Sequence, residues 1–370
     1  MPNNRVLLIV NSVYHLLTAV HLCHTLLADA EADLIVTDIT PQLRDCMPRI
    51  RETGVFGRVL FAAVRELNQK YAGAKGEVLD EGFSQAERLF RFALSDELGT
   101  YDAVYFANFD PFTRMLACRL YDMPCVFIGY EDGFSSYVID YLREDRAPIN
   151  RHPQGGKIRD KVEGILLYEP RLAMRGDTLP NLRMPKIRRD NVRLREQLNH
   201  IFAYTPPETQ ADFLFLEQSF RAEGIKTNDI ELMRLCQQTV GAGRFAVKPH
   251  PRNPENLPFR LGLTRKYAGD APWELFLLNE ERPNQVLLTV CSNAALTGRL
   301  VFGMDIPTVM LYRLFEGKVL WKEDAVLSRY LQRFRRQFAG KNYYVPQTVY
   351  ELKAVLGYLG EGGGSHGGTG

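Results

Sequence analysis

Short apolar runs alternate with amphipathic stretches along the first 130 residues. The runs are strand-sized and cover 5–10, 33–37, 59–62, 103–107 and 125–129. Between them, apolar positions recur at helical spacing over 13–27, 84–98 and 111–121. Strand–helix alternation of this kind is typical of a parallel sheet with helices on both faces. The N-terminal half is therefore predicted to be α/β.

The same alternation restarts in the second half of the chain. Strands are expected over 212–216, 244–247, 286–290 and 308–311, and helices over 229–240, 272–279 and 294–302. The stretch from about 140 to 205 is polar, basic and rich in proline and glycine, so we interpret it as an irregular connection. We predict an N-terminal domain over 1–205, a C-terminal domain over 206–358 and a disordered glycine-rich tail over 359–370.

Two tandem α/β sheets joined by an irregular segment are typical of the GT-B arrangement, in which two Rossmann-like domains enclose a cleft. Several dehydrogenases, kinases and binding proteins are also built in this way, so the fold class alone leaves the function open. No G-x-G-x-x-G follows the first strand, and no G-x-x-x-x-G-K-[ST] occurs in the chain. A dinucleotide oxidoreductase and a P-loop NTPase are therefore disfavoured.

Composition narrows the class further. Hydrophobic residues make up 45% of the 370 residues, charged residues make up 24%, and the net charge is only +2, so we expect no nucleic-acid partner. The apolar runs fall far short of the ~20 residues of a membrane span, and the N-terminus lacks the basic region of a signal peptide. We expect a cytoplasmic protein. The six cysteines form no C-x-x-C pair, which favours reduced thiols over a metal site.

Positive charge is concentrated in one region. Between 151 and 200 there are twelve Lys or Arg residues against six Asp or Glu. A solvated helical face accounts for such an excess. The alternative is a surface for an anionic acceptor, or for peripheral contact with the inner membrane through 151–195.

Two adjacent carboxylates follow the strand at 125–129. Glu131 and Asp132 precede Gly133, whose missing β-carbon permits a tight turn. The carboxyl ends of parallel strands are where α/β sheets bind ligands, and crowded carboxylates gain affinity for a proton. One of the pair is thus a candidate general base, although E-D-G is also ordinary turn chemistry.

A histidine between prolines follows the short strand at 244–247. The segment reads Lys248-Pro249-His250-Pro251-Arg252, and the prolines restrict the backbone around the imidazole. Such a histidine can protonate a departing phosphate, helped by the charges of Lys248 and Arg252. A surface histidine in a proline loop is the alternative.

The strand at 286–290 leads into a helix through Ser292 and Asn293. Either residue at the helix N-cap would leave backbone N–H groups pointing outward, where a phosphate binds well. A simple cap with no ligand is the alternative.

The ordered set of an acid pair, a His-Pro and a serine resembles the D/E-D/E-G, H-P and serine motifs of bacterial sialyltransferases. The segments PHPR (249–252) and SNAALT (292–297) resemble glycosyltransferase family 52, the lipooligosaccharide sialyltransferases. The resemblance implies an inverting GT-B enzyme that needs neither a metal nor a cofactor. It also implies that His250 acts on the CMP phosphate, that Ser292 holds that phosphate and that Pro251 shapes the loop.

The resemblance extends to further residues. Asp132 would deprotonate the acceptor hydroxyl, while in some members the base follows the first strand of the C-terminal domain, where Glu217 lies. Glu274 is similar to a family acid near the ribose, and Ser219 is a further donor-side candidate. Asn11 and Ser12, in the first strand–helix loop, are acceptor-side candidates.

We therefore expect transfer of sialic acid from CMP-sialic acid to a galactose-terminated glycan. Three alternatives stay open: elongation of a capsule or polysialic acid chain, use of another nucleotide sugar such as UDP-glucose, and non-catalytic binding of a nucleotide or glycan. The acceptor, the linkage and the oligomeric state, including a homodimer, do not follow from the sequence.

Overall fold

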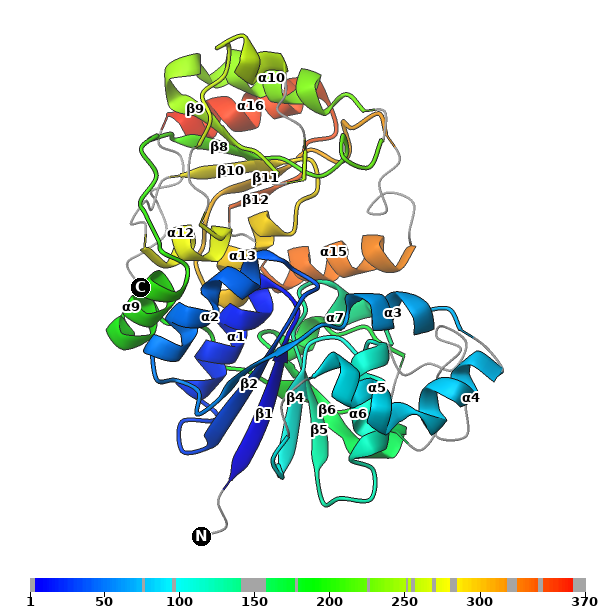
Figure 1. Cartoon of the computed structure of the whole chain (residues 1–370). Helices are drawn as coiled ribbons and strands as arrows, with labels where there is room; N and C mark the ends of the chain where they lie inside the picture. The colour runs from blue at the N-terminus through cyan, green and yellow to red at the C-terminus, as the bar shows by residue number, and fades with distance from the viewer. Residues whose placement is uncertain are drawn as a thin grey trace. The chain divides into compact units, whose positions relative to one another are not determined.

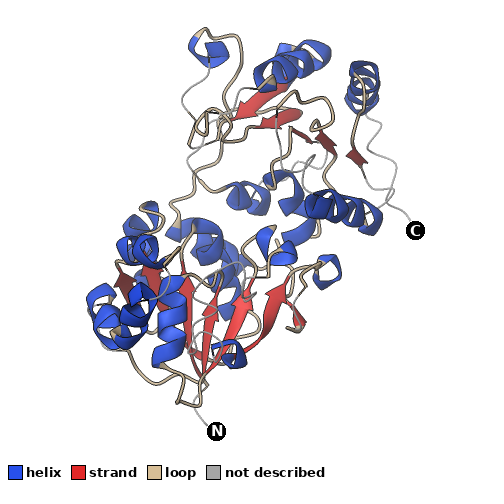
Figure 2. Cartoon of the chain, turned by 90° about the vertical axis from the view of Figure 1, so that its right-hand side faces the viewer, coloured by secondary structure: helices blue, strands red, loops and turns tan. Residues whose placement is uncertain are grey.

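The computed structural model describes residues 4–74, 77–94, 98–140, 158–176, 179–224, 227–250, 252–253, 257–267, 271–279, 285–317, 325–338 and 342–361. Contacts divide the chain into two units, 1–204 and 205–370 (Figures 1 and 2). Each unit is an α/β structure around its own parallel sheet, as the alternating pattern predicts.

The first unit contains a seven-stranded sheet in the order β3-β2-β1-β4-β5-β6-β7, and all of its strand pairs are parallel. The apolar runs of the sequence form its buried centre, because a parallel sheet is covered on both faces. The strands are β1 Arg5–Val10, β2 Glu31–Thr37, β3 Val59–Ala62, β4 Ala103–Phe106, β5 Val126–Tyr130, β6 Val162–Leu167 and β7 Asn181–Arg183.

Helices cover both faces of this sheet. One face carries α1 (Val13–Cys23), α2 (Gln42–Glu52) and α9 (Val192–Ile201), and α9 contacts both of the others. The other carries α3 (Arg65–Tyr71), α4 (Glu77–Ser84), α5 (Ala86–Ala93) and α6 (Pro111–Arg119) (Figure 1). The short helix α7 (Ser135–Val138) follows β5, and single 3-10 turns lie at Arg159–Lys161 and Pro170–Leu172.

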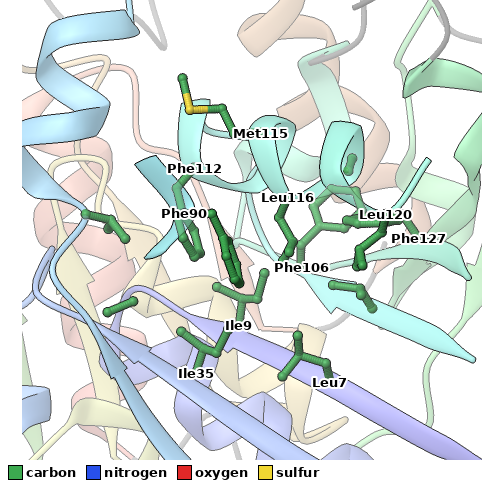
Figure 3. Close-up of a cluster of buried hydrophobic side chains, with 14 of the residues drawn as sticks. Leu7, Ile9, Ile35, Phe90, Phe106, Phe112, Met115, Leu116, Leu120 and Phe127 are labelled. Carbon is green, nitrogen blue, oxygen red and sulfur yellow. The ribbon is translucent and has the colours of Figure 1, made fainter. Parts of the chain in front are cut away.

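A buried apolar cluster fixes α5 and α6 against the sheet. Phe90 and Phe112 stack with their ring centroids 6.4 Å apart, while Ile9 and Phe106 contribute from the strands (Figure 3). All four side chains are at most 7% exposed. Burying an aromatic or aliphatic side chain of this size stabilises the fold by roughly 1.5–3 kcal/mol, so the cluster holds the strand ends in place.

The second unit contains a five-stranded parallel sheet in the order β12-β11-β10-β8-β9. Its strands are β8 Phe213–Leu216, β9 Phe245–Lys248, β10 Val286–Thr289, β11 Thr308–Met310 and β12 Tyr343–Tyr344. One face is covered by α10 (Asp229–Val240) and α16 (Val349–Gly360), and the other by α12 (Trp273–Asn279), α13 (Ala294–Val301) and α15 (Ala325–Gln337) (Figure 1). A short helix, α11, spans Leu257–Arg260, and a 3-10 turn spans Ala242–Arg244.

Strand order reverses once in each sheet. The first strand of each unit lies between two later ones, β1 between β2 and β4, and β8 between β9 and β10. Loops at the carboxyl ends of such adjacent strands leave the sheet in opposite directions and open a crevice, which is the usual ligand position in open α/β sheets. The fold thus directs attention to the loops after β1 and β4 and to those after β8 and β10.

Two sequence predictions differ from the structure. The stretch 140–205 is not merely a connection, because β6, β7 and α9 extend the first sheet and its helical layer. The helix expected over 84–98 is shorter, because α5 covers only Ala86–Ala93, and residues 95–97 lie outside the described residues. The sequence did not predict α15, β12 or α16. Within the described residues, no helix combines the length and apolar character that crossing a bilayer requires.

Candidate functional site

The loop after β8 holds a buried carboxylate. The Glu217 side chain is 1% exposed and accepts hydrogen bonds from Arg221 Nη2 at 3.0 and 3.1 Å. It also accepts from the backbone N–H of His250 at 3.3 Å and from Asn253 Nδ2 at 3.4 Å. Because Arg221 also pairs with Asp229, Glu217 belongs to a fixed ionic network that positions the neighbouring histidine loop.

His250 is half-buried at the end of β9. Its Nδ1 accepts the backbone N–H of Arg252 at 3.2 Å, so the neutral ring carries its proton on Nε2. Burial, followed by the charge of Arg252, holds the pKa of His250 below its ordinary value of 6.5. The ring is therefore a neutral Nε2–H donor at pH 7. Pro251 lies outside the described residues.

Arg252 and Ser219 converge on one carboxylate. The guanidinium Nη2 of Arg252 lies 3.1 Å from Ser219 Oγ and 3.2 Å from Glu223 Oε1, and Ser219 Oγ donates to the same Glu223 oxygen at 2.5 Å. The Arg252 side chain is 66% exposed. A hydroxyl and a guanidinium directed at a single anionic oxygen are the kinds of donor that bind a phosphate.

Lys248 and Glu274 lie near each other on β9 and α12. The Lys248 ammonium lies 4.5 Å from the Phe276 ring centroid, a cation–π contact. Burial raises the pKa of the partly exposed Glu274, and the charge of Lys248 opposes that rise. The pair places one cation and one carboxylate beside the His250 loop.

Ser292 and Asn293 lead from β10 into α13. Ser292 Oγ accepts the backbone N–H of Ala294 at 3.3 Å, and its own N–H donates to Thr289 Oγ1 at 3.0 Å. Asn293 occupies the N-cap position, but its exposed side chain makes no capping hydrogen bond. Ser292 therefore already satisfies one N–H of the helix start, while the Asn293 amide faces solvent.

Two amides that the sequence analysis did not single out tie the three loops together. Gln218 Oε1 accepts from the backbone N–H and the thiol of Cys291, at 3.0 and 2.9 Å. The Gln218 carbonyl accepts from Asn253 Nδ2 at 2.6 Å. The loops after β8, β9 and β10 thus form one hydrogen-bonded platform at the strand-order reversal of the second sheet.

In the first unit, the acid pair after β5 splits into two different environments. Glu131 is 1% exposed and accepts from the Tyr14 hydroxyl at 3.1 Å, from the Tyr137 hydroxyl at 2.5 Å and from the Tyr168 N–H at 3.0 Å. Burial raises its pKa to about 7, against the opposing effect of these hydrogen bonds. Its oxygens are enclosed by donors, so Glu131 ties the loop after β5 to the end of β6.

Asp132 has a partner that the sequence analysis missed. Its Oδ1 lies 2.5 Å from Nε2 of His15, which is buried in the first turn of α1. The Asp132 N–H donates to Ser136 Oγ at 2.7 Å, and Oδ2 lies 3.5 Å from Ser135 Oγ. Because the Asp132 side chain remains 27% exposed, it is the member of the acid pair that a ligand can reach.

The acceptor-side candidates have different roles in the structure. Asn11 is buried, and its side-chain amide forms hydrogen bonds with Asn108 at 2.6 Å, Asp110 at 3.1 Å and Thr37 at 2.8 Å, so it links the loop after β1 to the end of β2 and the loop after β4. Ser12 caps α1 by accepting the His15 N–H at 3.2 Å. Gly133 has φ +64°, which explains glycine in this turn.

Much of the basic stretch is engaged within the first unit. Arg175 donates to the Ser136 carbonyl at 2.8 Å, Lys186 lies 3.6 Å from the buried Glu169, and Arg188 pairs with Asp190. Residues 151–157 and 177 lie outside the described residues. The contact of Arg175 brings part of this charge beside the loop that carries Asp132.

Searches against protein-family models and against curated protein sequences returned no match. Several solved structures, however, are similar in fold. An Arabidopsis thaliana protein, UGT89C1, complexed with quercetin, has a TM-score of 0.52 at 12% identity, over 96% of this chain and 90% of that one. The UDP-GlcNAc 2-epimerase of Methanocaldococcus jannaschii has a TM-score of 0.53 at 10% identity, over 96% and 92%.

A third similar structure is an α/β-galactoside α-2,3-sialyltransferase from the marine bacterium Photobacterium phosphoreum. Its TM-score is 0.51 at 8% identity, over 93% of this chain and 99% of that one. At such identities the likeness concerns the fold. The chain is an α/β protein of the GT-B type with two Rossmann-like domains.

Proposed function

We propose that the protein is an inverting glycosyltransferase that moves sialic acid from CMP-sialic acid to a galactose-terminated glycan, as in lipooligosaccharide or capsule assembly. The observation that carries the proposal is the platform formed by the loops after β8, β9 and β10. It gathers a neutral imidazole donor, a guanidinium and two hydroxyls at the strand-order reversal of the second sheet. The GT-B fold and the motif resemblance support the same class.

In this proposal the second unit holds the leaving group. Ser292, Ser219 and Arg252 bind the donor phosphate, and Nε2–H of His250 donates to the oxygen that departs with CMP. The neutral ring donates through Nε2–H, because its Nδ1 accepts the backbone N–H of Arg252. Lys248 and Glu274 are proposed to contact the rest of the nucleotide, with Glu274 at the ribose.

The first unit supplies the base. The acceptor hydroxyl oxygen attacks the anomeric carbon as the bond from that carbon to the phosphate oxygen breaks, and the hydroxyl proton passes to Oδ2 of Asp132. One displacement inverts the anomeric configuration. We favour Asp132 over Glu217 because the Glu217 side chain is 1% exposed and accepts two hydrogen bonds from Arg221. The Asp132 side chain is 27% exposed. Glu131 supports the loop rather than the chemistry.

Nucleotide titration tests the donor assignment. Isothermal titration with CMP, CDP and UDP is expected to give the tightest binding for CMP, and Arg252→Gln is expected to weaken it. Preference for UDP would instead support a uridine-donor enzyme, a second candidate favoured by the fold shared with the UDP-GlcNAc 2-epimerase. Binding without turnover of any nucleotide sugar would support a non-catalytic binding protein.

The remaining assignments are testable in the same assay. We propose that the reaction needs no metal, so EDTA is expected to leave the transfer rate unchanged. We also propose a glycan acceptor, with a capsule or polysialic acid chain as the alternative that the nearby Arg175 and Lys186 favour. Rate constants with neutral and sialylated acceptors of equal length separate these two classes. Peripheral membrane contact through 151–195 is tested by flotation with anionic vesicles.

A further inference from the structure

The imidazole of His15 is buried beside the proposed catalytic carboxylate, 117 residues away in sequence. The residue is 1% exposed, and its ring lies edge-on to Tyr130 with centroids 6.0 Å apart. Helix α1 places it there, because Ser12 caps the helix and His15 lies in its first turn, beneath the loop after β5. Its position is thus set by the fold on several sides.

Hydrogen bonds fix the tautomer of this ring. The backbone N–H of Asn11 donates to Nδ1 at 3.2 Å, so Nδ1 is an acceptor and carries no proton. The proton of the neutral ring is then on Nε2, which faces Asp132 Oδ1 at 2.5 Å. His15 is therefore a hydrogen-bond donor toward Oδ1 of the carboxylate.

The same contacts exclude a relay. A histidine that passes a proton onward must exchange it through its second nitrogen, and here that nitrogen is occupied by a main-chain donor. The other oxygen of Asp132, Oδ2, contacts only a long 3.5 Å neighbour, Ser135 Oγ, among the described partners. The two oxygens thus have separate tasks, with Oδ1 held by His15 and Oδ2 left to the acceptor.

We propose that His15 is the positioning residue of the acceptor-side base: its hydrogen bond holds Oδ1 of Asp132 and directs Oδ2 toward the acceptor hydroxyl. The inference rests on the proposed function, since it assigns Asp132 as base. His15 touches neither substrate nor leaving group. Its effect on the reaction is exerted through one hydrogen bond.

Two substitutions separate this role from a packing role. In His15→Asn, the side-chain oxygen can still accept the Asn11 N–H, but the amide is too short to reach Asp132. In His15→Gln, the longer amide places an N–H close to the position of Nε2. Both variants leave unchanged the other titratable groups near His15, Asp132 and Glu131. These groups are Tyr14 on α1, Tyr130 on β5, Glu131, Tyr137 on α7 and Lys186.

The readout is kcat/KM for the acceptor at saturating donor. His15→Asn is expected to lower kcat/KM by about 10- to 100-fold, because Asp132 loses the hydrogen bond that orients it. His15→Gln is expected to restore most of the wild-type value. The dissociation constant for CMP is expected to stay the same in both variants.

Equal losses in both variants, or no loss in either, would overturn the positioning role. Transfer that survives Asp132→Asn would instead overturn the proposed base and leave the His15 geometry untested by kinetics. For that case, ¹⁵N resonances of the His15 ring in the wild-type protein give an independent measurement. The inference requires a proton on Nε2, and a proton on Nδ1 would contradict it.

Discussion

At the residue scale, similar side chains acquire different roles from their surroundings. Glu131 and Asp132 are adjacent in sequence, yet one is enclosed by three donors while the other meets a histidine and remains accessible. Successive side chains of an extended backbone point in opposite directions, so two adjacent carboxylates can have different surroundings and different roles. The sequence identified the carboxylate pair. It did not identify His15, which is one of several polar residues in a largely apolar helix.

Burial of Glu131 makes the stability of the fold pH-dependent. The folded state keeps the proton up to a pKa of about 7, against an ordinary value of 4.5, so it binds more protons than the unfolded chain between these values. The contribution of Glu131 to the free energy of unfolding is therefore fully present below about pH 4.5 and is lost as pH rises through about 7. From pH 5 to 8 the loss from this group is about 2 to 3 kcal/mol.

Urea unfolding at pH 5 and pH 8 measures this effect, with Glu131→Gln as the comparison. The wild-type free energy of unfolding is expected to decrease more between the two values than that of the variant. Identical pH dependence in the two proteins would show that Glu131 titrates normally.

His250→Ala tests the leaving-group donor. Removing a hydrogen-bond donor to the departing phosphate oxygen is expected to lower kcat by about 10²- to 10³-fold while CMP affinity changes little, because Ser292 and Arg252 remain. His200→Ala is the matched control, since that exposed histidine lies in α9 and pairs with Glu52. Full activity of His250→Ala, or an equal loss in the control, would contradict the assignment.

At the element scale, strands proved more predictable than their connections. The runs at 5–10 and 59–62 coincide with β1 and β3, and α10 has the predicted bounds of 229–240, because apolar periodicity records burial directly. The region 140–205 was predicted wrongly as a connection. Its basic and proline-rich composition outweighed the short apolar run at the end of β6. An edge strand such as β7, with only three residues, has no period to detect.

The loop platform of the second unit is testable as an element. Gln218→Ala removes the acceptor of the Cys291 N–H, and a buried donor left without an acceptor costs about 1–3 kcal/mol. We expect CMP affinity to weaken by about tenfold or more, while the circular dichroism spectrum is retained. Gln332→Ala, on the exposed face of α15, is the control and should bind CMP normally. Unchanged affinity in Gln218→Ala would show that the platform does not organise the donor site.

At the scale of the whole molecule, the repeated α/β pattern was enough to predict two sheets and the GT-B type. The sequence could also place candidate residues after strands, because the carboxyl edge of a parallel sheet is the common ligand position. The sequence does not show which loops are joined by hydrogen bonds, since Gln218 and Cys291 are 73 residues apart. Such contacts depend on strand order, which a single sequence does not specify.

Ligand binding is expected to stabilise the molecule in a nucleotide-specific way. A ligand at 100 times its dissociation constant raises the free energy of unfolding by about 2.7 kcal/mol. Thermal unfolding with CMP, UDP and inorganic phosphate at one shared concentration, about 100 times the dissociation constant for CMP, is expected to give the largest shift for CMP. In Arg252→Gln, the shift with CMP is expected to be smaller at equal concentration. An unchanged shift would show that the loop platform does not bind the nucleotide.

The central claim is that the protein transfers sialic acid from CMP-sialic acid to a galactose-terminated glycan with Asp132 as base and His250 as leaving-group donor. Mass spectrometry and NMR of a reaction with CMP-sialic acid and a galactose-terminated oligosaccharide test it most directly. The account predicts a sialylated product of inverted anomeric configuration, formed by the wild type and almost abolished in Asp132→Asn and His250→Ala. A retained configuration, an active Asp132→Asn, or product only from a UDP-sugar would contradict it.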